Sequence, residues 1–137
     1  MRALEVCLTS GRKYSEQRRR DVAERPFNIV KVGTDMPRDV LYERINRRVD
    51  MMVEDGLIAE VENLAHLRHM NALQTVGYRE IFEYLDGNIS LDEAIELVKR
   101  NSRRYAKRQM TWFRRDPEIG WFSPNALSEI IEFIDSK

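Results

Sequence analysis

Apolar residues recur at every third or fourth position through most of the chain, a spacing that predicts amphipathic helices. The segments with this spacing are residues 37–56, 57–67, 77–87 and 90–116. Their ends carry the signals expected of helix boundaries. Pro37 suits a first helical position, and Ser90 with Glu93 matches a capping box. Asp116 followed by Pro117 is expected to end the longest of these helices.

The remaining segments are shorter. Residues 27–32 and 119–122 are rich in β-branched and aromatic side chains, which predicts two strands. Residues 2–8 and 125–134 predict short helices, whereas residues 12–26 have almost no apolar periodicity and are expected to form a mobile loop. The expected fold class is therefore mostly α-helical with two short strands. Two strands alone do not make a stable sheet, so we expect further strands of that sheet outside this chain.

Composition places the chain among soluble globular domains. Its 137 residues are 42% hydrophobic and 34% charged, with 23 basic and 23 acidic side chains. No apolar run approaches the roughly 20 residues that span a bilayer, so no membrane association is expected. The start lacks the apolar core of a signal peptide, and Cys7 alone cannot form an internal disulfide. The sequence therefore predicts a cytoplasmic protein.

The longest predicted helix concentrates positive charge. Residues 99–115 contain eight Lys or Arg and no acidic residue. At about 100° per residue, one side carries the basic residues and a threonine, namely Arg100, Arg103, Arg104, Lys107, Arg108, Thr111, Arg114 and Arg115. The other side carries Val98, Tyr105, Ala106, Trp112 and Phe113. A solvated surface helix is the alternative, but such faces normally mix signs because like charges repel. The pattern favours binding of a polyanion such as nucleic acid.

Two segments have distinctive sequences. Their residues are Gln74, Thr75, Val76, Gly77, Tyr78 and Arg79, and Lys107, Arg108, Gln109, Met110, Thr111, Trp112, Phe113 and Arg114. Residues 2–6, 56–57 and 60–61 add weaker matches. Together they resemble the C-terminal part of the tRNA dimethylallyltransferases, also called tRNA isopentenyltransferases. The likeness covers essentially the whole chain in the family's order and spacing.

The resemblance implies transfer of a dimethylallyl group from dimethylallyl diphosphate to N6 of the adenosine beside the tRNA anticodon, with Mg²⁺ assisting. For the full enzyme it implies an α/β fold whose parallel sheet is similar to that of P-loop kinases. Residues 27–137 would complete this core domain as its helical part. The implied partners are the tRNA anticodon stem-loop, dimethylallyl diphosphate and the missing N-terminal half of the same enzyme.

The resemblance also implies that residues 74–79 and 107–114 contact tRNA near the active site. The residue types suit that role, because Arg and Lys bind phosphates while aromatic and Arg planes stack on a base that has left its helix. Gly77 would allow close approach of the backbone. Tyr78 is a stacking candidate and Arg79 a phosphate candidate.

Several of these residues also suit structural roles. Tyr78 has helical spacing with Ile81 and Phe82, which fits a core position equally well. Trp112 and Phe113 lie on the apolar side of the predicted helix, so we interpret them mainly as core. The remaining candidates for contacts with phosphate or diphosphate are Arg2, Arg103 and Arg104.

Two features of a complete enzyme are missing from the sequence. None of the six glycines forms the GxxxxGK[ST] loop that cradles a diphosphate. No carboxylate has a case as the general base, which the family carries in its N-terminal half. His66 and His69 lie three residues apart, but without a nearby Cys or an HExxH motif they predict no metal site. The chain alone is therefore expected to bind no cofactor and to be inactive.

Two other functions fit the residues without the resemblance. One is a stand-alone helical RNA-binding module without catalysis, and the other is a protein-interaction domain whose basic face meets an acidic partner. Preference for an anticodon hairpin over a generic duplex would distinguish these functions.

Overall fold

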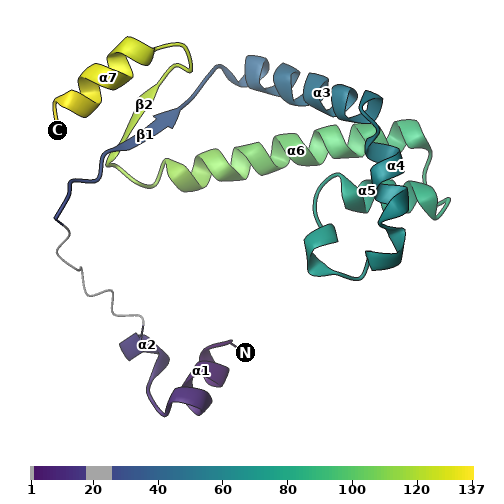
Figure 1. The fold of residues 1–137 in the computed structure, drawn as a ribbon, viewed down its shortest axis with the longest axis horizontal. Helices are drawn as coiled ribbons and strands as arrows, with labels where there is room; N and C mark the ends of the chain where they lie inside the picture. Colours follow the sequence, from purple (N-terminus) through teal and green to yellow (C-terminus); the bar gives the residue numbers. More distant parts are fainter. Residues whose placement is uncertain (1, 18–25) are drawn as a thin grey trace.

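A computed structural model of the chain describes residues 2–17 and 26–137 (Figure 1). Its longer elements are α1 (Arg2–Ser10), β1 (Lys31–Thr34), α3 (Arg38–Glu54), α4 (Leu57–Asn63), α5 (Tyr78–Leu85), α6 (Leu91–Phe113), β2 (Ile119–Phe122) and α7 (Leu127–Asp135). Its single-turn helices are α2 (Tyr14–Gln17), η1 (Ala65–Leu67) and η2 (Asn71–Leu73). Among these helices none is long and apolar enough to cross a membrane.

The buried core is formed by helices alone. Its central side chains are Leu57 and Val61 of α4, Ile81 and Phe82 of α5, and Ala94 of α6, each at most 5% exposed. Burying an aliphatic or aromatic side chain of this size contributes about 1.5–3 kcal/mol. Helices α3 and α6 run side by side, with α4 and α5 at one end of the pair and the strands at the other (Figure 1). The helical core and the strands therefore lie at opposite ends of the same two helices.

The two strands pair with each other in parallel. The register runs from Lys31 opposite Ile119 to Thr34 opposite Phe122, and the Asp35 N–H donates to the Phe122 carbonyl at 2.9 Å. At the start of the pair, Lys31 Nζ lies 2.8 Å from a carboxylate oxygen of Asp116. Because parallel strands need a crossover, the whole of α3–α6 forms the connection between β1 and β2.

Glycine is required on both strands by close packing. A Cβ at Gly33 would lie 2.8 Å from ring atoms of Trp121. A Cβ at Gly120 would lie 2.8 Å from the ring of Phe133, which stands on α7 and contacts Phe122 at a centroid distance of 5.3 Å. The sheet thus holds an indole against β1 and seats α7 against β2.

The predicted helices and the strand at residues 119–122 are confirmed, and some boundaries are corrected. The first strand is at Lys31–Thr34 instead of residues 27–32, because its position is determined by pairing with β2 and not by local alternation. Pro37 precedes the first helical residue, and its carbonyl accepts the N–H of Leu41 at 3.0 Å.

Three further expectations need adjustment. The helix predicted over 57–67 ends at Asn63 and continues only as the single turn η1. The two strands, expected to be isolated within the chain, pair with each other. In the expected loop at 12–26, Tyr14–Gln17 form one helical turn, and residues 18–25 lie outside the described residues.

Candidate nucleic-acid interface

Helix α6 extends from the core to the sheet. Its start is capped as the sequence predicts, since Ser90 Oγ accepts the N–H of Glu93 at 3.2 Å. Ala94 and Val98 are buried against the neighbouring helices, with 0% and 3% exposure. No residue of α6 beyond Val98 is buried, so the last four turns of the helix are accessible within the described structure.

The interpretation of Trp112 and Phe113 as core residues is wrong for this chain. Trp112 is 65% exposed, Phe113 41% and Tyr105 51%. The apolar side of α6 is buried at Val98, in the first half of the helix. The same side continues beyond the helical core, and there none of the described elements covers it. Large exposed aromatic side chains of this kind mark a surface that meets another molecule or another part of a protein.

Two cations of α6 make internal contacts, chiefly with α3. Lys99 Nζ lies 2.7 Å from a carboxylate oxygen of Asp50 and 3.0 Å from one of Glu96. The hydrogen bonds to these two carboxylates raise the pKa of Lys99 above its ordinary value. Arg103 donates to the side-chain oxygen of Asn46. These side chains fix α6 against α3 and are not free for phosphates.

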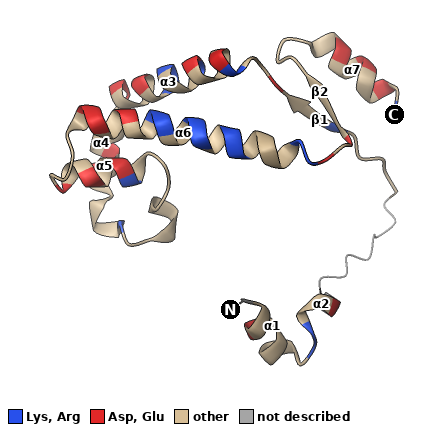
Figure 2. Ribbon diagram, turned by 180° about the vertical axis from the view of Figure 1, so that it is seen from behind, with Lys and Arg blue, Asp and Glu red and all other residues tan. Residues whose placement is uncertain are grey.

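Five other cations form what we call the basic strip. They are Arg100, Arg104, Lys107, Arg108 and Arg115, which are all exposed and have no acidic partner among the described residues. Figure 2 shows the concentration of basic residues along the middle of α6, in contrast to the mixed charges of α3. Repulsion between neighbouring like charges is uncompensated here, so a polyanion would stabilise the strip.

A hollow of about 470 Å³ lies on this strip. Its lining residues are Arg104, Lys107, Arg108, Thr111, Trp112 and Arg115. Trp112 offers an exposed indole face beside four cations, and the Arg108 guanidinium stands 5.8 Å from the centre of the Tyr105 ring. Cations next to exposed aromatic rings suit a phosphate backbone whose bases stack on the rings.

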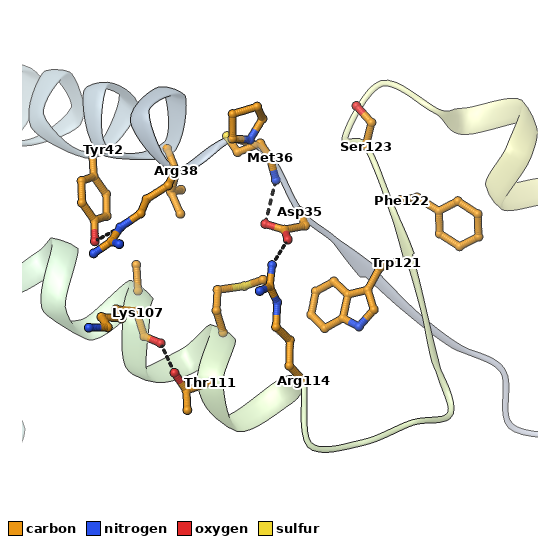
Figure 3. Close-up of a pocket in the computed structure, with 14 residues that line it drawn as sticks. Asp35, Met36, Arg38, Tyr42, Lys107, Thr111, Arg114, Trp121, Phe122 and Ser123 are labelled. Atoms are coloured by element: carbon orange, nitrogen blue, oxygen red, sulfur yellow. Dashed lines mark hydrogen bonds and ion pairs between the residues drawn. The ribbon is translucent and has the colours of Figure 1, made fainter.

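A larger pocket of about 770 Å³ lies where α3, α6 and the strand ends meet (Figure 3). Lys107, Thr111 and Arg114 line it from α6, and Asp35 and Arg38 line it from the segment after β1. Arg114 donates to an Asp35 carboxylate oxygen, while the other Asp35 oxygen accepts the Met36 N–H at 2.8 Å. In this pocket Lys107 keeps its charge unpaired, whereas Arg114 does not.

Aromatic side chains of α3 and β2 also line the larger pocket. Arg38 Nε donates to the Tyr42 hydroxyl at 2.9 Å, and its guanidinium stands 5.1 Å from the centre of the Tyr42 ring. Trp121 of β2 also lines the pocket. The sequence analysis missed Asp35, Arg38 and Tyr42 as site residues, because they belong to the pocket only through contacts with residues far along the chain.

The segment 107–114 does not form a single surface. Lys107, Thr111 and Arg114 face the larger pocket, whereas Gln109, Trp112 and Phe113 line a third hollow of about 1070 Å³ beside β1. Met110 lies between these two hollows and lines both. Only Lys107, Arg108, Thr111 and Trp112 of this segment lie at the hollow on the basic strip. Residues that are consecutive in the sequence motif therefore face different sides of the helix.

The segment 74–79 precedes and begins α5. Gln74 Nε2 donates to the Arg68 carbonyl at 2.6 Å, and Arg68 in turn makes a bidentate pair with Asp86. The side chains of Thr75, Val76 and Arg79 are exposed. Gly77 has a φ of +104°, and no described atom lies within 4 Å of the Cβ position there, so its backbone conformation and not close packing requires glycine.

Tyr78 and the phosphate candidates have distinct placements. The Tyr78 hydroxyl donates to a carboxylate oxygen of Glu60, and its ring packs against the core, in line with the structural role. Arg104 is exposed on the basic strip, whereas Arg103 bonds to Asn46. Arg2 belongs to α1, and its side chain lies outside the described structure.

Comparison with known proteins decides the family. The family model described as IPP transferase matches residues 1–116. The chain belongs to the IPP transferase family. It is 52% identical over 132 residues to "tRNA dimethylallyltransferase 1" of Bacteroides thetaiotaomicron, covering 96% of this chain and 43% of the relative. It is 47% identical to "tRNA dimethylallyltransferase" of Halalkalibacterium halodurans, covering all of this chain and 46% of the relative.

Solved structures of IPP transferases agree with the fold described above. The full-length tRNA isopentenylpyrophosphate transferase of Bacillus halodurans matches 84% of this chain and 40% of its own, with a TM-score of 0.73 and 48% identity. The tRNA delta(2)-isopentenylpyrophosphate transferase of Staphylococcus epidermidis matches 98% of this chain and 47% of its own, with a TM-score of 0.74 and 34% identity. The chain therefore spans less than half the length of the IPP transferases it matches.

Proposed function

We propose that this chain supplies the RNA-binding part of a tRNA dimethylallyltransferase acting in the cytoplasm. The full protein would move a dimethylallyl group from dimethylallyl diphosphate to N6 of the adenosine beside the anticodon. The observation that carries the proposal is the basic strip on a chain of the IPP transferase family. Its five exposed cations have no acidic partner among the described residues, and the exposed rings of Trp112 and Tyr105 lie beside them.

The roles follow from chemistry. The cations of the strip bind phosphates of the anticodon stem-loop, and the exposed rings stack on bases that have left the helix. Lys107 also faces the larger pocket, where an ammonium group would stabilise negative charge on a phosphate. The exposed apolar side chain of Phe113 packs against the rest of the enzyme, which supplies the general base and the diphosphate-binding loop.

The proposal assigns no metal ligand to this chain. Mg²⁺ takes near-octahedral oxygen ligands, usually one or two carboxylates with water and substrate phosphates. In the part of the chain that the structure describes, no group of three or more His, Cys, Asp or Glu residues could hold a metal ion. In the full enzyme, Mg²⁺ would be held chiefly by the diphosphate, by water and by one or two carboxylates.

A salt-series binding titration tests the proposal. The chain is titrated with an adenosine-bearing anticodon hairpin and with a scrambled hairpin of equal length. We expect tighter binding to the anticodon hairpin. If all five cations contact phosphates, the slope of log K against log salt is about −3.5 for single-stranded contacts and about −4.5 for duplex contacts.

Two double variants distinguish RNA binding by the strip from a general effect of positive charge on the chain. Arg104→Ala with Arg108→Ala removes two cations of the strip and should make the slope shallower by about 1.4–1.8. Arg47→Ala with Arg48→Ala removes two exposed arginines of α3 outside the strip and is the matched control. Equal slopes for the two double variants, or equal binding to both hairpins, would contradict the proposal.

A further inference from the structure

Glu80 is the only buried charged residue within residues 2–17 and 26–137, with 8% of its surface exposed. One carboxylate oxygen accepts the backbone N–H of Gly77 at 2.8 Å. The other accepts a side-chain N–H of Asn101 at 2.7 Å. Glu80 has no ion pair with a described cation. Both oxygens of a buried carboxylate are thus committed to neutral donors on two different elements.

A buried carboxylate without a cation loses the stabilisation that water gives it, and only its hydrogen bonds offset that loss. The bond to Gly77 is that of a capping box, in which the side chain of the third helical residue accepts the N–H of the residue before the helix. The bond to Asn101 adds a second function, since it links the start of α5 to α6. Glu80 therefore forms a polar contact, which we call the joint, between two helices that also pack through core side chains.

The joint lies between the two candidate RNA-binding surfaces. On one side is the segment 74–79, in which Gly77 holds a φ of +104° while its N–H is bound by Glu80. On the other side is α6, where Asn101 lies about one turn before Arg104 and about two turns before Arg108. The two bonds of Glu80 therefore connect the segment 74–79 to the helix that carries the basic strip.

We propose that Glu80 is a positioning residue for RNA binding, which holds the segment 74–79 at a fixed distance and orientation from the basic strip. This inference rests on the proposed function. When the Glu80 contacts are broken, the strip still attracts phosphates. Arg79 and the strip, however, no longer bind the same RNA at a fixed distance and orientation from each other. Specific binding then falls while binding governed by salt alone persists.

Two substitutions test the joint, one that breaks the contact between residues 80 and 101 and a second that restores it. Asn101→Asp places a second carboxylate against Glu80 and breaks the contact by repulsion and loss of the donor. Adding Glu80→Gln restores it, because the Gln amide N–H donates to Asp while its oxygen still accepts the Gly77 N–H. Glu83→Gln is the matched control, since Glu83 stands exposed on the same helix and bonds only to Asn88 among the described residues.

The readouts are the affinity ratio between the anticodon and scrambled hairpins, the hydrogen exchange of the Gly77 amide, and the melting temperature. We expect Asn101→Asp to reduce the affinity ratio about tenfold, equivalent to about 1.4 kcal/mol, and to speed Gly77 exchange. The double variant should restore both, and Glu83→Gln should change neither. A lower melting temperature with an unchanged ratio would indicate a merely structural contact and would overturn the inference.

Failure of the inference differs from failure of the proposed function. If the unaltered chain prefers the anticodon hairpin but Glu80→Gln does not rescue Asn101→Asp, only the positioning role is wrong. If the unaltered chain shows no preference between hairpins, the proposed function fails and the positioning role fails with it. Gly77 exchange would then still show whether the joint forms in the free chain.

Discussion

At the scale of the residue, hydrogen bonds determine which side chains remain available to a ligand. The Tyr78 hydroxyl donates to the Glu60 carboxylate, and this bond, together with partial burial, raises the pKa of the Tyr78 phenol above its ordinary value. Its ring packs among core side chains while its oxygen is occupied. Arg79, the next residue, is exposed. Two neighbouring residues of one motif therefore have different roles, one internal and one directed to solvent.

We expect Glu60→Gln to lower the pKa of Tyr78, because a neutral amide neither accepts as strong a hydrogen bond nor repels the phenolate. Phenolate absorbance at 295 nm measured against pH follows the titration, and Tyr78→Phe identifies the signal. Since the pKa is raised in the folded state, the stabilisation is present below about pH 10 and is lost as the pH rises further. Identical titration curves for Glu60→Gln and the unaltered chain would contradict the bond.

At the scale of the element, the sheet depends on two glycines that admit aromatic rings. Gly120 lies under the Phe133 ring of α7, and Gly33 lies under the indole of Trp121. Helix α7 itself has an exposed apolar side that includes Leu127 at 68% and Ile131 at 50%. Its attachment to the rest of the chain therefore depends on a few close contacts at β2.

We expect Gly120→Ala to destabilise the docking of α7 by about 1–3 kcal/mol, since the new methyl group overpacks against Phe133. Hydrogen exchange should become faster in α7 and stay unchanged in α5 and the first half of α6. Trimming the ring with Phe133→Leu in the same chain should recover part of the protection. Uniformly faster exchange throughout the helical core would show that the effect is not local.

Local signals predicted the helices well, and non-local contacts explain the errors. Ser90 with Glu93 marks the start of α6 within a few residues of sequence. The position of β1 depends on β2, far along the chain, so local alternation placed it four residues too early. In the candidate site, too, local features were predicted from the sequence and contacts between distant residues were not. The sequence identified the concentration of cations, but the carboxylates and amides that pair with Lys99, Arg103 and Arg114 come from α3 and the end of β1.

At the scale of the whole molecule, the described elements lack parts that the proposed reaction requires. All six glycines serve turns, helix ends or close packing, and none forms a loop that would cradle a diphosphate. The basic strip supplies charge without a general base. A binding surface alone positions an RNA but does not accept the proton that N6 must lose on alkylation.

The purified chain is therefore expected to transfer no dimethylallyl group. Incubation with tRNA, Mg²⁺ and radiolabelled dimethylallyl diphosphate should leave the tRNA unlabelled. The Bacillus halodurans tRNA isopentenylpyrophosphate transferase serves as the positive control in the same reaction. Label in tRNA above the level of a no-protein blank would show that a base and a diphosphate site lie within these residues.

The parallel pairing of β1 and β2 has a consequence for the order in which the protein forms. Lys31 bonds to Glu118, which lies 87 residues further along the chain. A ribosome adds about 5–20 residues per second, so β1 leaves it several seconds before its partner strand exists. Helices α3 to α5 make mostly local contacts and fold in far less time. During synthesis the helical region is thus complete, or nearly so, before the first strand can pair with β2.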